Sequence, residues 1–409
     1  MTDLLVTNVR PFAGSPVDLR ISGETIVAIG PGLAEPDGDA AASRIDGRGM
    51  IALPGFVNAH AHVDKSWWGL PWVSGGGAGG TDGRIAHERA ERDRLGLPSV
   101  AATRRVLAEF LRHGTTDVLI HVDVDPGVGL RGIEVVREAV ASFGGAIRVA
   151  VVAFPQDGVL RRPGVDALLR SAIDDGVTVI GGLDPAAIDR DPVGQLDLLF
   201  GLASEHDVDV DIHLHDPGEL SLFEFELIIE RTLRHERQGR VTISHGFALA
   251  QLPPDRQGSL IGRLAEAGIA LATVSPVNQP ALPLKPLRDA GVCVGLGTDG
   301  IRDLWSPFGD GDMLRMANLL ARKNAFNHDH DLTLALNVAL GQTGGLIPAD
   351  HHPELRSDAP ANVVLIPAET LSELVASVPA RQTVITHGQV AVLDGVRQPL
   401  LDVDSVDPV

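Results

Sequence analysis

The sequence predicts an α/β protein, a (β/α)8 TIM-like barrel with a small β-sandwich domain formed by both chain ends. Eight apolar, β-branched segments follow one another through the middle of the chain, and stretches with helical periodicity separate most of them. This alternation is typical of a closed parallel barrel. The two ends of the chain carry short strands and turns instead.

Residues 1–54 and 358–409 are expected to form the small domain together. Both segments carry short β-rich runs separated by turn residues, and His387-Gly388 has the composition of a tight turn. Because the two ends share one character, we expect their strands to pair. The expected strands are residues 4–7, 17–21, 25–29, 362–366 and 383–386.

Residues 55–357 are expected to form the barrel. Residues 100–112 and 188–206 have helical apolar spacing, whereas residues 66–96 are rich in Gly and Trp and predict a loop over the barrel mouth. The eight expected strand segments are residues 55–62, 115–124, 147–156, 177–184, 209–216, 240–247, 269–276 and 292–300.

Charge and cysteine content exclude several classes of partner. The 34 Lys and Arg residues against 54 Asp and Glu residues leave a net charge of −20, which repels nucleic acids and anionic membranes. The single cysteine, Cys293, lies in an apolar run and is interpreted as a buried strand residue. It excludes the Pro-Cys-x-x-Cys site of nucleic-acid deaminases. Without a signal peptide or an apolar run near ~20 residues, we expect a cytoplasmic protein.

Polar side chains stand at the expected carboxyl ends of four barrel strands, where barrel enzymes place their reactive groups. His60 and His62 are two residues apart in a strand, so both can point into the barrel. Imidazole nitrogens with one carboxylate oxygen suit zinc or iron(II). The remaining strand-end candidates are His213, His215, Asp216, His245 and Asp299.

Other histidines are interpreted differently. His328 and His330 have the same spacing as the first pair but lie in a polar stretch, as do His351 and His352, so we expect all four to be exposed. His121 lies in the middle of the second strand, where a core histidine with satisfied hydrogen bonds is the first interpretation.

Residues 53–62, which read LPGFVNAHAH, resemble the first-strand signature of the amidohydrolase superfamily. The later strand-end residues follow that superfamily's order, and the resemblance covers nearly the whole chain. It implies metal ligation by His60, His62, His213 and Asp299, with His245 beside the metal. Residues 177–183 lack the lysine that bridges two metals in binuclear members. One divalent ion is therefore implied, Zn²⁺ first and Fe²⁺ as the alternative.

Two branches of the superfamily are similar to this chain. Residues 153–158 resemble cytosine deaminases, which implies that Gln156 contacts the substrate ring. Asn278 and Trp305 also match that branch. However, Asp216 stands where those enzymes have a glutamate, and Gly300 where they have a second aspartate.

The N-isopropylammelide isopropylaminohydrolases, which remove an alkylamine from an s-triazine ring, are the more similar branch. Lys65 and His215 match this branch, while Gly300 and the loop at residues 67–80 depart from it. A homo-oligomer is implied by the resemblance alone. The matching segments are residues 62–66, 121–125, 182–186, 213–216 and 301–309.

The expected function is displacement of ammonia or an alkylamine from a small pyrimidine-like or triazine-like heterocycle by a metal-activated water. His245, Asp299 or His215 accepts the water's proton. Asp216 either transfers a proton or orients a ligand histidine.

For Lys65, the alternatives are stabilisation of negative charge on the ring and a salt bridge to Asp64 or a loop acid. Gln156 offers a donor and an acceptor, and the Trp305 indole can stack on a flat ring. Hydrolysis of a cyclic amide, and a barrel that only binds its ligand, are the competing interpretations of the whole protein.

Overall fold

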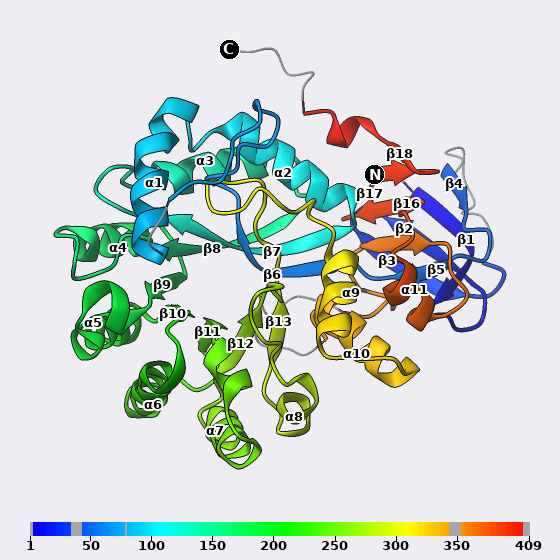
Figure 1. The fold of residues 1–409 in the computed structure, drawn as a ribbon. Helices are drawn as coiled ribbons and strands as arrows, with labels where there is room; N and C mark the ends of the chain where they lie inside the picture. The colour runs from blue at the N-terminus through cyan, green and yellow to red at the C-terminus, as the bar shows by residue number, and fades with distance from the viewer. Residues whose placement is uncertain (1–2, 34–42, 78–79, 343–352, 404–409) are drawn as a thin grey trace.

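The computed structural model describes residues 3–33, 43–77, 80–342 and 353–403. Two nine-stranded sheets organise these residues (Figure 1). One sheet is the curled, parallel sheet of an α/β barrel, and helices surround it. The other sheet contains strands from both ends of the chain.

The parallel sheet contains all eight strand segments that the sequence predicts. The eighth segment is split in two: β13 pairs with β12, and β14 pairs with β6, which brings the sheet back to its first strand. The strands are β6 (Phe56–His62), β7 (Thr115–Asp123), β8 (Arg148–Phe154), β9 (Val179–Leu183), β10 (Asp209–Leu214), β11 (Val241–His245), β12 (Ala270–Thr273), β13 (Val294–Leu296) and β14 (Asp299–Gly300).

The break between β13 and β14 follows from close packing against β6. A Cβ atom on Gly297 would lie 2.3 Å from the carbonyl oxygen of His60, so only glycine fits there. Next to it, Asn58 Nδ2 donates to Thr298 Oγ1 at 2.8 Å, and the Thr298 amide donates to Asn58 Oδ1 at 3.1 Å. These contacts hold Asp299 at the mouth of the barrel.

Helices lie on the outside of the parallel sheet (Figure 1). The helix predicted at residues 100–112 is confirmed. The helix predicted at 188–206 begins later, at Pro192, because a π-helical turn, η1 (Pro185–Asp189), precedes it. Asp191 caps the helix by accepting from the Gly194 amide at 2.8 Å. The helices are α2 (Val100–Arg112), α3 (Arg131–Ala141), α4 (Val165–Asp174), α5 (Pro192–His206), α6 (Gly218–Arg234), α7 (Pro254–Glu266), α8 (Leu284–Asp289), α9 (Met313–Lys323) and α10 (Asp329–Ala339).

The prediction that residues 66–96 form a loop is wrong for their second half, because α1 (Gly80–Leu95) lies there. Its buried side chains are Ile85, Glu88 and Arg92. A helix whose buried face is mostly charged has no apolar stripe, so hydrophobic periodicity does not detect it.

The second sheet joins the two chain ends, as the sequence predicts. β5 pairs antiparallel with β15, and blue N-terminal strands lie beside orange and red C-terminal ones in Figure 1. His387 and Gly388 form the predicted turn, both at positive φ. The strands are β1 (Asp3–Pro11), β2 (Val17–Ser22), β3 (Thr25–Gly30), β4 (Ser43–Asp46), β5 (Ile51–Leu53), β15 (Val363–Ile366), β16 (Thr383–Thr386), β17 (Gln389–Leu393) and β18 (Val396–Arg397).

Two further expectations meet the structure here. Cys293 lies just before β13 and is half-buried, so the prediction of a buried strand residue is wrong. In the part of the chain that the structure describes, no helix has both the length and the apolarity needed to cross a membrane.

Candidate active site

Four predicted metal ligands converge at the carboxyl ends of β6, β10 and β14. His62 Nε2 lies 3.4 Å from His213 Nε2. Asp299 Oδ1 lies 3.6 Å from His62 Nε2 and 3.8 Å from His60 Nε2. Four atoms placed tetrahedrally about 2.1 Å from a zinc ion are about 3.4 Å apart. The ligand atoms of His60, His62 and His213 all lie within 4.8 Å of one another, so these histidines, with Asp299 beside two of them, can hold one divalent ion.

The hydrogen bonds of His60 also fit a metal ligand. Its Nδ1 lies 2.9 Å from Ser244 Oγ, and that hydroxyl donates to Asp211 Oδ1 at 2.7 Å. Because the hydroxyl proton points to Asp211, Nδ1 of His60 must carry the proton it donates to Ser244. Nε2 is then an unprotonated acceptor, buried and without a hydrogen-bond partner among the described residues.

The electrostatic surroundings keep these histidines neutral, as ligands must be. Burial lowers the pKa of His60, His62 and His213 well below the ordinary value, and the proximity of the other site histidines, and of Lys65 for His62, disfavours a proton further. His121 lies next to this group, with its ring centroid 4.1 Å from that of His60 and its Nε2 3.2 Å from Asp211 Oδ2. It is fully buried, as a core residue would be, but neither ring nitrogen has a hydrogen-bond partner among the described residues, so the expectation of satisfied hydrogen bonds is wrong.

His215 and His245 form the adjoining wall, with ring centroids 4.2 Å apart. Asp184 holds His215: its Oδ2 lies 3.0 Å from His215 Nδ1, and its Oδ1 accepts from the His215 amide at 2.5 Å. Burial opposes protonation of His215, but the Asp184 carboxylate outweighs it and raises the pKa. The sequence analysis missed Asp184, although it directly follows β9 and so stands at a strand end.

Asp216 points to a different set of groups. Its Oδ2 accepts from the Ala187 amide at 3.2 Å, and it shares a hydrogen bond with Glu224 of α6. Burial raises the pKa of Asp216, and raises that of Glu224 to about 8. The carboxylate that contacts His215 is therefore Asp184, while Asp216 pairs with Glu224.

Lys65 is buried, 4 % exposed, among acceptors. Its Nζ donates to Asp123 Oδ1 at 2.7 Å and to Gln156 Oε1 at 2.9 Å, and lies 3.5 Å from Glu88 Oε2. Burial opposes the charged form, but Asp123 and Glu88 outweigh it and raise the Lys65 pKa. The structure thus pairs Lys65 with Asp123 and the α1 acid Glu88, and Asp64 instead accepts from the Asp123 amide at 2.9 Å.

The four predicted substrate-binding residues, Lys65, Gln156, Trp305 and Asn278, are not all together. Gln156 lies beside Lys65, and Trp305 donates from Nε1 to Glu88 Oε2, with its ring centroid 5.9 Å from Lys65 Nζ. Asn278, in contrast, is exposed in the turn after β12 and has no hydrogen bond with the described residues.

Gly300 makes room for Asp303, a buried acid that sequence reasoning missed. A Cβ atom on Gly300 would lie 1.7 Å from Asp303 Oδ2. Asp303 Oδ1 accepts from the amides of Trp305 at 2.8 Å and Ser306 at 2.7 Å, and burial raises its pKa to about 7. The unusual glycine therefore accompanies a carboxylate next to the proposed ligand Asp299.

Of the two remaining histidine pairs that the sequence predicts to be exposed, the structure describes one. His328 and His330 are exposed, as predicted, and their rings lie 6.1 Å apart. His351 and His352 lie outside the described residues.

Comparison with known proteins identifies the family of this chain. The family model described as "Amidohydrolase family" matches residues 99–390. The chain belongs to the amidohydrolase family. The sequence-based assignment to this family is thereby confirmed.

This amidohydrolase is similar to three known proteins along nearly its whole length. It is 29% identical over 406 residues to N-isopropylammelide isopropyl amidohydrolase of Pseudomonas sp. strain ADP, covering 96% of this chain and 98% of that one. The crystal structure of N-isopropylammelide isopropylaminohydrolase from Burkholderia multivorans has 39% identity and a TM-score of 0.91, covering 97% and 100% of the two chains. The 5-methylcytosine deaminase from Klebsiella pneumoniae, liganded with phosphonocytosine, has 25% identity and a TM-score of 0.79, covering 96% and 99%.

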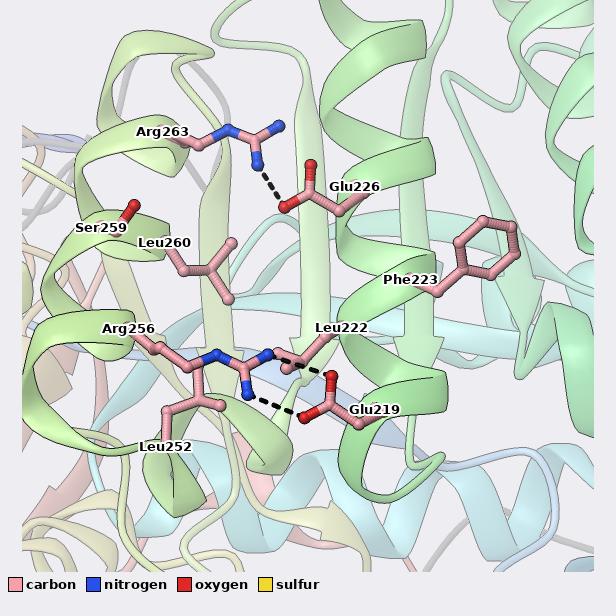
Figure 2. A pocket seen from close by; sticks show the side chains of 9 residues that line it. All are labelled: Glu219, Leu222, Phe223, Glu226, Leu252, Arg256, Ser259, Leu260 and Arg263. Atoms are coloured by element: carbon pink, nitrogen blue, oxygen red, sulfur yellow. Dashed lines mark hydrogen bonds and ion pairs between the residues drawn. The ribbon is translucent and has the colours of Figure 1, made fainter.

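A separate groove of about 360 Å³ lies on the outer surface of this amidohydrolase between α6 and α7 (Figure 2). Arg256 binds Glu219 at 2.8 and 3.0 Å, and Arg263 binds Glu226. Because these charges pair with one another and no predicted site residue lines the groove, we assign no chemistry to it.

Proposed function

We propose that the chain is a metal-dependent aminohydrolase that displaces ammonia or an alkylamine from a small pyrimidine-like or s-triazine-like ring. The observation that carries this proposal is the cluster of His60, His62 and His213, whose ligand atoms all lie within 4.8 Å of one another, with Asp299 Oδ1 at 3.6 Å from His62 and 3.8 Å from His60. The names of the relatives, an N-isopropylammelide isopropylaminohydrolase and a 5-methylcytosine deaminase, support the choice of ring.

The same four residues would hold one divalent ion, Zn²⁺ first and Fe²⁺ as the alternative. Such an ion supplies Lewis acidity and lowers the pKa of a bound water toward neutrality. Ser244 fixes the tautomer of His60, so that residue presents a lone pair and not a proton to the ion.

We assign the proton transfers to His245, Asp299 and His215, which surround the same space. As the ring carbon gains its C–O bond, one of them accepts the water's proton. As the C–N bond breaks, the departing nitrogen takes up a proton and leaves as a neutral amine or ammonia. Asp184 orients His215 for this transfer. For Asp216, whose hydrogen bonds go to the Ala187 amide and to Glu224, we assign a structural role.

Substrate recognition is assigned to Lys65, Gln156 and Trp305. Because Gln156 Oε1 already accepts from Lys65, its amide group is left with Nε2 as a donor. These side chains therefore offer hydrogen-bond donors to the substrate, and such donors suit a ring with an oxo oxygen or an unprotonated ring nitrogen. Trp305 would flank the ring. The predicted role of Asn278 in substrate binding stays a prediction.

The decisive experiment is an assay of metal-replete protein with cytosine, isocytosine, ammelide, N-alkyl ammelides and cyclic ureas, following amine release and ring opening. We expect amine release from at least one ring amine. His213→Ala should abolish it and lower the bound metal measured by mass spectrometry, because one of four ligands is missing. His330→Ala, on the surface, is the matched control and should retain both.

Turnover of cyclic ureas alone would replace the proposal with cyclic amide hydrolysis. Full activity after complete removal of metal by a chelator would contradict the metal-dependent mechanism.

Several organisational predictions accompany the function. We propose domain limits at residues 1–54, 55–357 and 358–409, a β-sandwich arrangement of the terminal sheet, a cytoplasmic location and a homo-oligomer. The sandwich is supported by one apolar core shared by both chain ends, which includes Val6, Ile21, Ala52, Val363 and Ile385.

A further inference from the structure

Helix α1 places a buried carboxylate beside the candidate active site. Glu88 is 2 % exposed. Its helix lies in the connection between β6 and β7 along the chain. A buried carboxylate is costly unless charged or hydrogen-bonding groups compensate it. The partners of Glu88 should therefore explain why it is there.

Those partners are two proposed recognition residues. Trp305 Nε1 donates to Glu88 Oε2, and Lys65 Nζ lies 3.5 Å from the same oxygen. Glu88 also shares a hydrogen bond with Asp123, the second carboxylate at Lys65. One carboxylate oxygen thus links the cation and the indole that are both assigned to substrate recognition.

The position of Glu88 is itself fixed, because α1 is bound to three strand ends. Arg92 contacts both oxygens of Asp125, after β7, at 2.5 and 3.1 Å. Arg89 Nη1 lies 3.0 Å from Asp157, after β8. One turn earlier, Ile85 packs in an apolar cluster with Phe154, Leu183, Ile188 and Trp305.

We propose that Glu88 is a positioning residue of the active site, which holds Lys65 and Trp305 in the arrangement that binds the substrate ring. This inference rests on the proposed function and extends it to a helix outside the barrel. Without the Glu88 carboxylate, the indole N–H has no acceptor and Lys65 is held by Asp123 and Gln156 alone. Both side chains then sample other rotamers, and the ring loses its preformed site.

A double-mutant cycle tests this proposal. Glu88→Ala should lower kcat/KM about tenfold to about a hundredfold, the range for a lost hydrogen bond to a charged group, mainly through a higher KM. In a Trp305→Phe background the same change should cost several-fold less, because the indole it positions is gone. Glu88→Gln, which retains an acceptor but not the charge, should be intermediate.

Glu91→Ala is the matched control. Glu91 lies on the same helix and pairs with Arg94 of that helix, whose side chain is 61% exposed. It should leave kcat/KM within about twofold of the wild-type value, since surface pairs contribute little. Equal losses from Glu88→Ala in both backgrounds would overturn the proposal.

Tryptophan emission gives a readout that needs no substrate. The Trp305 spectrum is the difference between proteins with and without Trp305, and it should shift when Glu88 becomes Ala but not when Glu91 does. An unchanged Trp305 spectrum in folded Glu88→Ala would overturn the proposal. If the wild-type protein released no amine from any ring, the proposed function would fail, whereas this spectrum would still decide whether Glu88 holds Trp305.

Discussion

Unusual backbone conformations mark the residues at the centre of the site. Asp184, His245 and Asp299 have φ values of 31°, 71° and 61°, in the left-handed region that non-glycine residues rarely adopt. Asp184 follows β9, His245 ends β11 and Asp299 begins the two-residue β14, so each lies where the chain changes direction at the mouth of the barrel. Such strain persists only where surrounding contacts hold it, and it is concentrated at functional sites.

Gly300 is the residue whose change tests this packing most directly. Gly300→Ala should lower the free energy of unfolding by about 1–3 kcal/mol, because the new methyl group overlaps Asp303 Oδ2. Chemical denaturation measures the loss. Gly201→Ala on α5, where an added Cβ meets open space, should instead be neutral or stabilise by up to about 1 kcal/mol. A harmless Gly300→Ala would show that Asp303 has room to move.

At the scale of elements, α1 shows how a charged helix can be an integral part of a barrel. Its contacts with β7 and β8 are ionic, and Ile85 supplies its apolar contact. The groups that anchor this helix should therefore control its local stability more than the stability of the whole fold.

Arg92→Ala should loosen α1. The change leaves Asp125 buried, with its side chain 1% exposed and its main cation gone, a loss of about 3–5 kcal/mol for a broken buried pair. Hydrogen exchange should reveal faster exchange across residues 80–95. The exposed pair of Asp82 with Arg161 is the control, and Arg161→Ala should change exchange little. Equal exchange in the two variants would contradict the anchoring role of Arg92.

At the scale of the whole molecule, a buried ion pair connects the terminal sheet to the barrel. Arg381, just before β16, binds Asp312, which caps α9; one of its two contacts is 3.1 Å long. Asp312 accepts from the Leu314 and Arg315 amides as well. Burial favours the neutral acid, but Arg381 and then His113 outweigh it and hold the pKa of Asp312 below its ordinary value.

This pair predicts a pH dependence of stability. Because the folded pKa is lowered, the contribution of Asp312 is complete above the ordinary aspartate pKa of about 4 and is lost as the pH falls through the folded value. Urea unfolding of metal-free protein should give a cost for Arg381→Met of about 3–5 kcal/mol at pH 7 that shrinks toward pH 3.

The exposed pair of Arg48 with Asp394 provides the comparison. Arg48→Met should cost less than about 1 kcal/mol at both pH values. A cost for Arg381→Met that did not depend on pH would mean that Asp312 is not the titrating partner.

Much of this molecule could be predicted from local patterns. The eight barrel strands are apolar runs of the right length. In the first of them, the alternation of side chains already places His60 and His62 on one face. The order of His213, His245 and Asp299 along the chain then matches that of the amidohydrolases, and this resemblance implies the ligand set of His60, His62, His213 and Asp299. These features are local or repeat along the chain, so they are visible without coordinates.

Tertiary structure alone decided the rest. α1 escaped prediction because two of its three buried side chains, Glu88 and Arg92, are charged. A charge is tolerated inside a protein only when a partner compensates it, and these partners come from distant parts of the chain. Likewise, Asp184 and not Asp216 contacts His215, and Gly300 accommodates Asp303, because of distances between neighbouring strand ends and turns. Hydrophobic patterning therefore predicts where the barrel lies, whereas the pairing of buried charges depends on three-dimensional proximity that no sequence period encodes.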